Sequence, residues 1–282
     1  MADALMGQTE IAAASKADVS SVVQSFLIQE AKLLGKVSDY SQFAVKGAKS
    51  VDLPISGGFS AVAKAENVAS DSQIITYAAD TITFNQHDQV QWLNEEIADN
   101  QAAINLLQDQ LMKASKALAL QVDTDIVTEL KLASASAPDH QVVFASTGDD
   151  IVALGDVLAA KALLETQNIE FNECYIGVGP EKMNEMLAIA SFIQAERWGN
   201  SEPIQKGVIG SIYGAKVVQS SLFADFMCTW HPSAVGIAFQ RGATFQSQAD
   251  LANLGIRYSL DQRYGVEVLD SGKRCVLTDS TS

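Results

Sequence analysis

Apolar residues recur at helical spacing in the middle of the chain, where the hydrophobic pattern is strongest. The spacing steps by three, four and seven residues, at Ile97, Ile104, Leu107, Leu111, Ala114, Leu118, Val122, Ile126 and Leu130. No glycine or proline interrupts the chain from Leu93 to Ala137, and Pro138 then ends the pattern. We predict one long amphipathic helix of about 30 residues, which would span about 45 Å. This length exceeds that of most globular helices and indicates a scaffold element.

The pattern before this helix is different. Residues 12–34 carry apolar residues at helical spacing, and Gly35 is a suitable stop. Residues 50–91 then alternate, and we interpret them as a long two-stranded arm. Its strands are predicted at 51–55, 59–65 and 74–84, with a polar connection at 66–71. An isolated hairpin is only marginally stable in water, so the arm must rest on its own chain or on a neighbouring one.

Short strands and helices are interleaved after Pro138. Strands are predicted at 141–145, 173–178 and 234–240, short strands with tight turns at 208–220, helices at 151–166 and 180–189, and a polar loop at 191–206. Residues 256–268 and 273–277 read as a C-terminal hairpin around a turn at Asp270, Ser271 and Gly272. Because the strands and helices show no regular alternation, an α+β fold is favoured over a doubly wound sheet.

Composition excludes several classes of protein. Hydrophobic residues make up 48% of the chain, so a substantial core is expected. The 34 acidic residues against 19 basic ones give a net charge of −15, which disfavours nucleic-acid binding. No apolar run approaches the roughly 20 residues of a membrane span, and the N-terminus does not resemble a secretory signal. Three widely spaced cysteines indicate buried apolar residues rather than a disulfide framework.

No motif carries a specific chemistry. Gly177 and Gly179 follow a predicted strand, but the third glycine of a phosphate-binding turn is missing and Pro180 lacks an N–H, so an ordinary turn is favoured. Cys228 and His231 have the spacing of metal ligands, yet two ligands do not complete a zinc site. His231 with the following proline is a better candidate for starting a turn.

The acidic pairs are also better explained by structure. Asp123 and Asp125 are two residues apart on the long helix and point in different directions, so we assign them to a solvated or interface face. Asp149 and Asp150 are assigned as helix caps. No Gly-x-Ser-x-Gly elbow occurs. We expect no catalytic residues, no cofactor and no metal, and the arm, hairpin and long helix suit contacts better than catalysis.

The order of elements resembles the major capsid proteins of tailed double-stranded-DNA bacteriophages, whose fold encapsulins and the herpesvirus capsid floor share. Residues 207–221 resemble the family's Gly-x-x-Gly-x-x-x-Gly-x-x-Val-x-x-Ser pattern through Gly207, Gly210, Gly214, Val217 and Ser220. Residues 263–268 and 274–276 are similar to its closing strands. The resemblance implies an N-terminal arm at 1–49 and an extended hairpin loop at 50–92. It also implies a peripheral domain with the spine helix at 93–147 and 243–265, and an axial domain at 148–242 and 266–282.

The resemblance implies a structural, non-enzymatic function. Copies would self-assemble as pentamers and hexamers into an icosahedral head that encloses double-stranded DNA without sequence-specific binding. Portal, separate scaffolding and decoration proteins are the implied partners, with assembly in the host cytoplasm and residence in the virion. An encapsulin-like compartment shell is the alternative, and a soluble α/β enzyme a remote one. Because the arm begins almost at Met1, either scaffolding is a separate protein or the chain is already processed.

The resemblance also suggests subunit contacts. Phe59, Tyr77 and Phe84 are candidates for packing on a neighbour, and Lys64 and Glu66 for salt bridges across the seam. The loop at 191–206 lies where the family contacts its five-fold and six-fold axes. There Arg197 and Trp198 are the strongest candidates, since Arg and Trp dominate interface energetics; for Trp198 the alternative is packing under its own loop. Among the basic residues of the C-terminal third, Arg257 and Arg263 are assigned to subunit contacts. The spacing of Lys64 and nearby asparagines does not support a covalent Lys–Asn cross-link.

Overall fold

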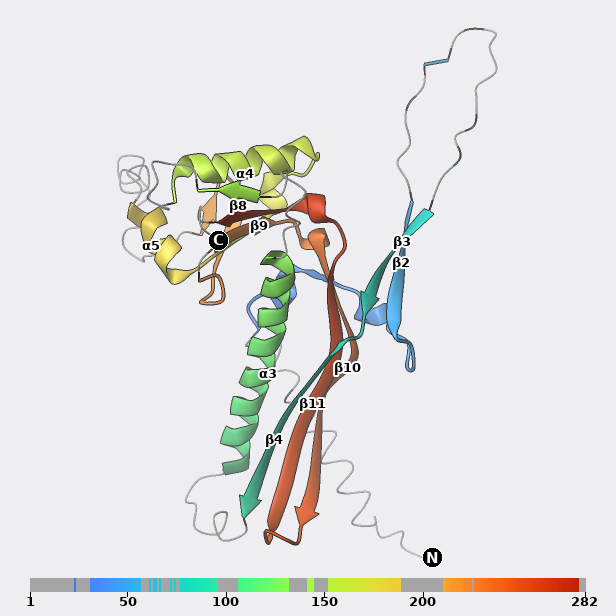
Figure 1. The fold of residues 1–282 in the computed structure, drawn as a ribbon, viewed down its shortest axis with the longest axis vertical. Coiled ribbons are helices and arrows are strands. Elements are labelled where there is room, and N and C mark those ends of the chain that lie inside the picture. Colours follow the sequence, from blue (N-terminus) through green and yellow to red (C-terminus); the bar gives the residue numbers. More distant parts are fainter. Residues whose placement is uncertain are drawn as a thin grey trace, which may run out of the picture.

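A computed structural model describes residues 23, 31–56, 61, 63, 64, 66, 72, 74, 77–95, 106–131, 141–144, 152–188, 210–224 and 226–278. The described strands form a four-stranded sheet, a six-stranded sheet and a two-stranded hairpin. Figure 1 shows the four-stranded sheet as a long, narrow layer with helix α3 beside it. The six-stranded sheet lies in a separate lobe at one end, and the hairpin projects on the side of the long sheet away from α3.

The four-stranded sheet, called the long sheet below, has the order β1-β10-β11-β4. Its strands are β1 (Ser38–Asp39), β10 (Val235–Asp250), β11 (Gly255–Val268) and β4 (Gln86–Glu95). Helix α3 (Leu106–Lys131) has 26 residues, or about 39 Å at 1.5 Å per residue. Its buried face includes six residues that the periodicity singled out: Leu111, Ala114, Leu118, Val122, Ile126 and Leu130. The long scaffold helix is therefore confirmed.

Strand β11 sends alternate side chains to opposite faces of the long sheet, as a strand must. Gln262 and Tyr264 face α3, where the Gln262 amide donates to the Leu118 carbonyl and the Tyr264 hydroxyl contacts Asp125. Gly265, the next residue, faces the hairpin instead, because a Cβ there would lie 2.1 Å from the Thr83 oxygen. One strand thus holds the helix on one face and the hairpin on the other.

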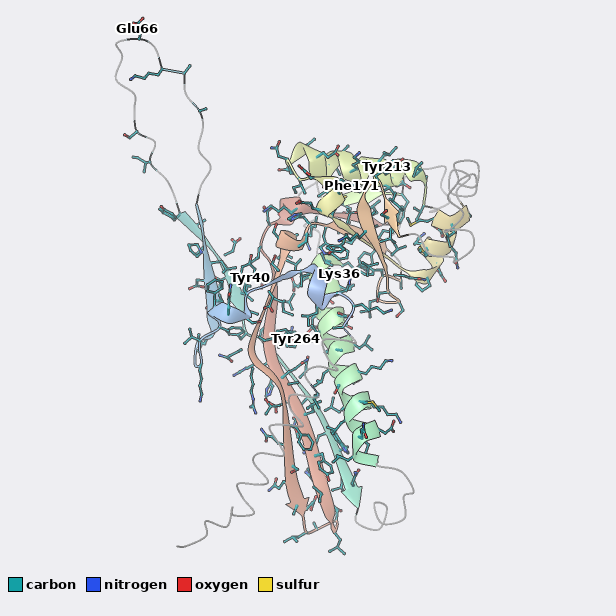
Figure 2. The ribbon with its side chains drawn as sticks, turned by 180° about the vertical axis from the view of Figure 1, so that it is seen from behind. Lys36, Tyr40, Glu66, Phe171, Tyr213 and Tyr264 are labelled. Atoms are coloured by element: carbon teal, nitrogen blue, oxygen red, sulfur yellow. The ribbon has the colours of Figure 1, made fainter. Side chains whose placement is uncertain are left out.

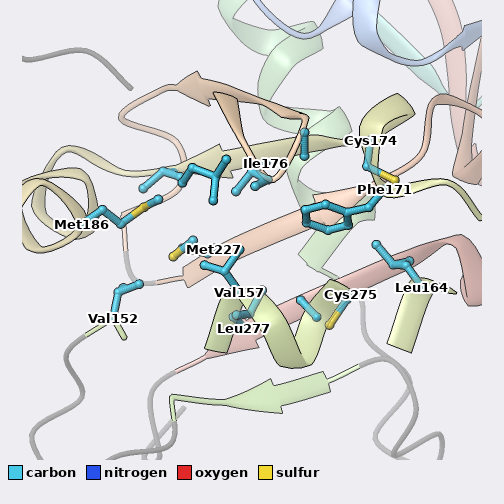
Figure 3. Close-up of a cluster of buried hydrophobic side chains, with 14 of the residues drawn as sticks. Val152, Val157, Leu164, Phe171, Cys174, Ile176, Met186, Met227, Cys275 and Leu277 are labelled. Atoms are coloured by element: carbon cyan, nitrogen blue, oxygen red, sulfur yellow. The ribbon is translucent and has the colours of Figure 1, made fainter. Parts of the chain in front are cut away.

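The six-stranded lobe has the strand order β5-β12-β9-β6-β8-β7. The strands are β5 (Gln141–Val143), β6 (Tyr175–Val178), β7 (Ser211–Ile212), β8 (Ala215–Gln219), β9 (Phe226–Trp230) and β12 (Arg274–Thr278). Helices α4 (Leu154–Thr166) and α5 (Pro180–Ala188) pack on this sheet. Figure 3 shows the resulting core, in which side chains from α4 and α5 meet those of β6, β9 and β12.

Two sets of polar contacts join the lobe to helix α3, which packs on the long sheet. The buried Arg274 of β12 donates to the carbonyls of Glu129 and Leu130, at the C-terminal end of α3. The buried Asp123 of α3 accepts the backbone N–H groups of Lys32 and Leu33 at 2.8 and 3.0 Å. We call residues 31–37 the strap. Because the indole of Trp230 in β9 donates to a strap carbonyl, that of Lys36, the strap ties α3 to the lobe.

Two sequence-based predictions about pairing are wrong. The two-stranded arm was expected to reach Gln91, but the hairpin of β2 (Ser50–Ser56) and β3 (Tyr77–Thr83) ends at Thr83. Residues 86–95 pair with β11 instead. Trp92 of this segment stacks on Tyr258 of β11, with ring centroids 5.7 Å apart. The C-terminal hairpin is also absent, because β11 pairs with β10 and β4 while β12 pairs with β9 and β5.

Other predicted elements and residues differ from the structure in their bounds or surroundings. Of the helix predicted at 12–34, the described residue Val23 is helical, residues 31–33 are not, and a 3-10 turn follows at Leu34–Lys36. The strand predicted at 234–240 continues to Asp250. Asp123 was assigned to a solvated or interface face, yet it is buried because it caps the strap. The caps predicted at Asp149 and Asp150 lie outside the described residues, and Asp156 accepts the N–H at the start of α4.

The turn between β6 and α5 is explained by packing. A Cβ at Gly177 would lie 2.4 Å from the Phe223 ring, and one at Gly179 would lie 2.0 Å from the Phe223 carbonyl oxygen. Both glycines therefore allow the segment at Phe223 to approach the strand closely. Pro180 opens α5, as predicted. The tight turns at 208–220 are confirmed for the described part, with Gly214 at a φ of +94° between β7 and β8.

Candidate assembly surfaces

The stem of the hairpin rests on the long sheet of its own chain. Two stem side chains, the Phe84 that follows β3 and one residue of β10 form a small buried cluster of Val51, Ile82, Phe84 and Ala238. Gly236 and Gly265 make room for it, since a Cβ at Gly236 would lie 2.9 Å from Ile82. A hairpin that is only marginally stable alone needs a surface to rest on, and the base of this one rests on the body of its own chain.

The outer part of the hairpin has no such cover. Strands β2 and β3 point away from the body, and Glu66 lies far from it (Figure 1 and Figure 2). Ile74 is 94% exposed and Tyr77 is 72% exposed. Lys64 and Glu66 are exposed, and neither has an ion pair among the described residues. The hairpin therefore presents both apolar and charged side chains to whatever lies beside it.

A groove lies at the foot of the hairpin, between the loop before β2 and the outer face of the long sheet. Its volume is about 960 Å³. We call it the basic groove, because the cationic side chains of Lys46, Lys49, Arg241 and Arg263 line it together with His87. Its one acidic residue is Asp261, which lies 3.2 Å from Arg241 and 3.7 Å from His87. Four separate segments of the chain contribute to this concentration of positive charge.

The free end of the long sheet carries a second apolar surface. The turn between β10 and β11 exposes Leu251 by 87% and Leu254 by 74%. The turn itself is ordered by Asp250, which accepts hydrogen bonds from Asn253 at 3.0 Å and Arg257 at 2.6 Å. These hydrogen bonds hold the pKa of Asp250 below its ordinary value. The result is a well-defined loop with uncovered leucines, which sequence reasoning did not single out.

A cluster of polar side chains lies between α3 and the long sheet, with Tyr264 buried and Asp88 and Asp125 half-buried. The Tyr264 hydroxyl lies 2.5 Å from a carboxylate oxygen of Asp125 and 2.8 Å from one of Asp88. Burial raises the pKa of Asp125; the hydrogen bond from Tyr264 offsets part of this increase, and the charge of Asp88 adds to it. Burial and the two carboxylates raise the pKa of Tyr264 as well. Since the phenol has one proton, it donates to only one of the two carboxylates at a time.

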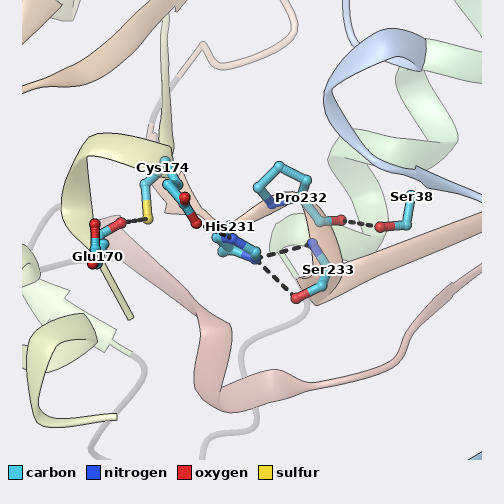
Figure 4. Close-up of polar contacts among 7 residues, drawn as sticks. Ser38, Glu170, Cys174, His231, Pro232 and Ser233 are labelled. Atoms are coloured by element: carbon cyan, nitrogen blue, oxygen red, sulfur yellow. Dashed lines mark hydrogen bonds and ion pairs between the residues drawn. The ribbon is translucent and has the colours of Figure 1, made fainter. Parts of the chain in front are cut away.

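Residues weighed earlier for metal or redox chemistry have structural roles. His231 accepts the N–H of Ser233 at 3.2 Å at the start of a 3-10 turn, as Figure 4 shows. All three cysteines are buried and free, and burial raises the pKa of Cys174 and of Cys275 to about 12. No group of three or more potential metal ligands occurs among the described residues. Within the same residues, no helix has the length and apolar character needed to cross a membrane.

A comparison with protein families identifies the family to which the chain with these surfaces belongs. A family model described as "Phage capsid protein" matches residues 78–277, well over half of the chain. The chain belongs to the phage capsid protein family. No curated protein sequence matches it significantly. The resemblance noted in the sequence is therefore confirmed at the level of the family, and the chain is a capsid protein.

Solved structures of capsids have the same fold. A chain from Mycobacterium phage Che8 superposes with a TM-score of 0.70 at 20% identity, covering 87% of this chain and 90% of that one. A chain of the cyanophage Pam1 capsid gives a TM-score of 0.71 at 10% identity, covering 90% and 94%. A virus-like particle from Pyrococcus furiosus gives 0.62 at 11% identity, covering 93% and 99%. The predicted α+β capsid fold is confirmed.

The predicted contact residues of this capsid protein fall into three groups. Phe59, Arg197 and Trp198 lie outside the described residues. Phe84 is only 8% exposed in the stem cluster, so it packs on its own chain and has little surface for a neighbour. The remaining candidates are accessible at two places, with Lys64, Glu66 and Tyr77 on the hairpin and Arg257 and Arg263 on β11. Their roles in contacts between subunits remain predictions.

Proposed function

We propose that this chain is the major capsid subunit of a phage head, and that its copies assemble as pentamers and hexamers into an icosahedral shell around double-stranded DNA. The observation that carries this proposal is the family match over residues 78–277. The exposed side chains of the hairpin and of the β10–β11 turn support it physically. Apolar area removed from water contributes roughly 25 cal/mol per Å², so a neighbour that covers Ile74, Tyr77 and Leu251 would stabilise the assembly.

The proposal includes finer statements about organisation and partners. The chain acts as a structural protein without enzymatic activity, it assembles in the host cytoplasm, and portal, scaffolding and decoration proteins accompany it. We retain the division into arm, hairpin loop, peripheral domain and axial domain as an interpretation. Its hairpin boundary moves from 92 to Thr83, because residues 86–95 belong to the long sheet.

Electron microscopy of particles isolated from cells that express the full chain tests the proposal. We expect closed shells of tens of nanometres with five-fold vertices. Nuclease-protected DNA inside particles from infected cells would identify a phage head, whereas a protein cargo without DNA would identify an encapsulin-like compartment. Small soluble oligomers as the only species, with the hairpin folded back onto its own subunit, would contradict the proposal.

A further inference from the structure

The basic groove contains positive charges that have no acidic partner among the described residues. Four cations elsewhere have a carboxylate partner within the subunit, at 2.6–3.6 Å: Arg257 with Asp250, Lys113 with Asp109, Lys273 with Asp270 and Lys161 with Glu165. In the groove only Arg241 and His87 have a carboxylate nearby, and both use Asp261. Lys46, Lys49 and Arg263 have no ion pair within the described part of the chain.

The backbone register of the long sheet brings two of these cations together. Arg241 and Arg263 are direct partners across β10 and β11, because β10 is irregular on both sides of Arg241. Like charges directly opposite each other destabilise a strand pair, whereas bulges commonly redirect a side chain toward a functional surface. Asp261 relieves only part of this repulsion, since its side chain is 3.2 Å from Arg241 but no ion pair joins it to Arg263. An anion from outside the subunit would relieve the rest.

We propose that the basic groove binds a carboxylate-bearing segment of a second copy of this chain, an inference that rests on the proposed function. Charge complementarity identifies the occupant. A subunit with 34 acidic and 19 basic residues brings a surplus of carboxylates to every neighbour. Association of such subunits requires places where that surplus meets unpaired cations. A volume of about 960 Å³ is at the upper end of the roughly 300–1,000 Å³ of small-molecule pockets and accommodates a peptide segment rather than one ion.

The groove is poorly suited to duplex DNA. Binding to a duplex depends on many phosphates neutralised at once, and the groove has three unpaired cations beside a carboxylate, Asp261. The contact is head-to-tail, because the groove on one copy meets a different surface on the next. Such contacts close into rings, as pentamers and hexamers require.

Zero-length cross-linking tests the proposal directly. Particles are assembled from an equal mixture of ¹⁴N-labelled and ¹⁵N-labelled subunits and treated with a carbodiimide, which joins a lysine amine to a carboxylate in contact with it. We expect Lys46 or Lys49 to be joined to acidic peptides in mixed-isotope pairs, which arise only between copies. Dilute, unassembled subunits should lack these products. Lys113 and Asp109, 2.8 Å apart in one subunit, provide the positive control for the reaction.

A matched pair of triple variants tests the energetics. Lys46→Gln/Lys49→Gln/Arg263→Gln removes the unpaired groove cations, whereas Lys113→Gln/Lys161→Gln/Lys273→Gln removes three cations from exposed local pairs. The two variants have the same net charge. We expect the groove variant to need roughly ten-fold more protein for half-maximal assembly and the control to stay within about two-fold, because exposed local pairs contribute little. The difference between the two variants in the protein concentration needed for assembly should shrink with added NaCl, since the Debye length falls to about 3 Å at 1 M.

Three results would overturn the inference. One is carbodiimide coupling of Lys46 and Lys49 only within single-isotope pairs, or no coupling while Lys113 reacts. Another is equal assembly of the two triple variants. The third is a mobility shift of a short DNA duplex by wild-type subunits that the groove variant loses, which would make DNA the ligand. Failure of wild-type subunits to form any particle would instead refute the proposed function, and with it this inference.

Discussion

Single residues determine how closely the elements of this capsid protein approach one another. Gly265 is the clearest case, because its missing side chain lets the Thr83 carbonyl of the hairpin cross β11. Asp125 is a second case, since its carboxylate on α3 lies close to Tyr264 of β11, whose hydroxyl also contacts Asp88 of β4. In both, the function of the residue depends on a segment far away in the sequence. Each therefore gives a prediction that local sequence could not.

Gly265→Ala is expected to destabilise the subunit by about 2 kcal/mol or more. The new Cβ would lie 2.1 Å from the Thr83 oxygen, a backbone atom that cannot move without displacing β3. Gly155→Ala is the matched control, because a Cβ there meets nothing within 4 Å. It should leave stability unchanged or raise it by up to about 1 kcal/mol. Urea unfolding of unassembled subunits measures both, and equal stability of the two variants would contradict the packing argument.

Asp125→Asn is expected to stabilise the subunit at pH 7 and to lose this advantage in acid. Burial raises the pKa of Asp125 in the folded protein above its unfolded value. The folded state therefore binds the proton more tightly, and wild-type stability falls as the pH rises from about 4 through the folded pKa. Asparagine carries no charge and keeps an oxygen that accepts from Tyr264. Urea unfolding at pH 4 and pH 7 gives the comparison.

The exposed Asp109→Asn serves as the control for this pH effect. It loses one exposed pair with Lys113, which contributes a few tenths of a kcal/mol. A gap between Asp125→Asn and wild type that does not depend on pH would show that the buried carboxylate is not the cause.

At the scale of elements, attachments between segments matter more than the segments themselves. The strap has little regular structure, yet it is held by α3 and by Trp230. The hairpin is regular at its stem, where it packs on the long sheet, and exposed beyond it. Loss of the strap contacts is therefore expected to affect the stability of the subunit, whereas loss of the outer hairpin is expected to affect assembly.

Asp123→Ala is expected to release the strap. The part-buried N–H of Lys32 and the buried N–H of Leu33 would lose their acceptor, at a cost of about 1–3 kcal/mol. Hydrogen exchange should therefore become faster at residues 32–37 before it changes in β10 or β11. Thr128→Ala on the exposed face of α3 is the control, since its hydroxyl bonds only within the helix. Unchanged exchange in the strap would refute this attachment.

Deletion of residues 61–76 is expected to prevent assembly while leaving the subunit folded. The stem pairs of β2 and β3 and their buried cluster are retained, so the melting temperature should change little. The exposed Ile74 is removed with the outer hairpin. Electron microscopy and circular dichroism measure the two effects, with Trp198→Ala as a comparison variant for the loop at 191–206. Normal particle yield from both would remove the support for these contact assignments.

At the scale of the whole molecule, the lobe and the long sheet are held together by buried contacts. Arg274 is central to them, because its guanidinium joins β12 of the lobe to the end of α3. A cation is also favourable at this end of a helix, where carbonyl groups have no partner within the helix. Burial lowers the pKa of Arg274, so its charge is held in a site that depends on these carbonyls.

Arg274→Ala is expected to destabilise the subunit by about 2–4 kcal/mol, because the last carbonyls of α3 would be buried without a donor. Lys273→Ala, one residue earlier, removes only an exposed pair with Asp270 and should cost less than about 1 kcal/mol. Thermal unfolding followed by circular dichroism compares them. Similar losses in both variants would show that the buried guanidinium does not hold the two parts together.

The sequence by itself determined the local features of this protein. The buried face of α3, the Pro180 helix start and the turns around Gly214 follow from periodicity and backbone preference. These depend on neighbours only a few residues apart, so they can be recognised in one sequence.

Only the tertiary structure decided which strands pair and what their side chains meet. An alternating segment such as 86–95 is compatible with a hairpin or with the long sheet, and the choice depends on β11, more than 150 residues away. The basic groove follows the same rule, since Lys46, His87, Arg241 and Arg263 become neighbours only when those strands are paired. Strand pairing is set by burial over long distances along the chain, which no local pattern encodes.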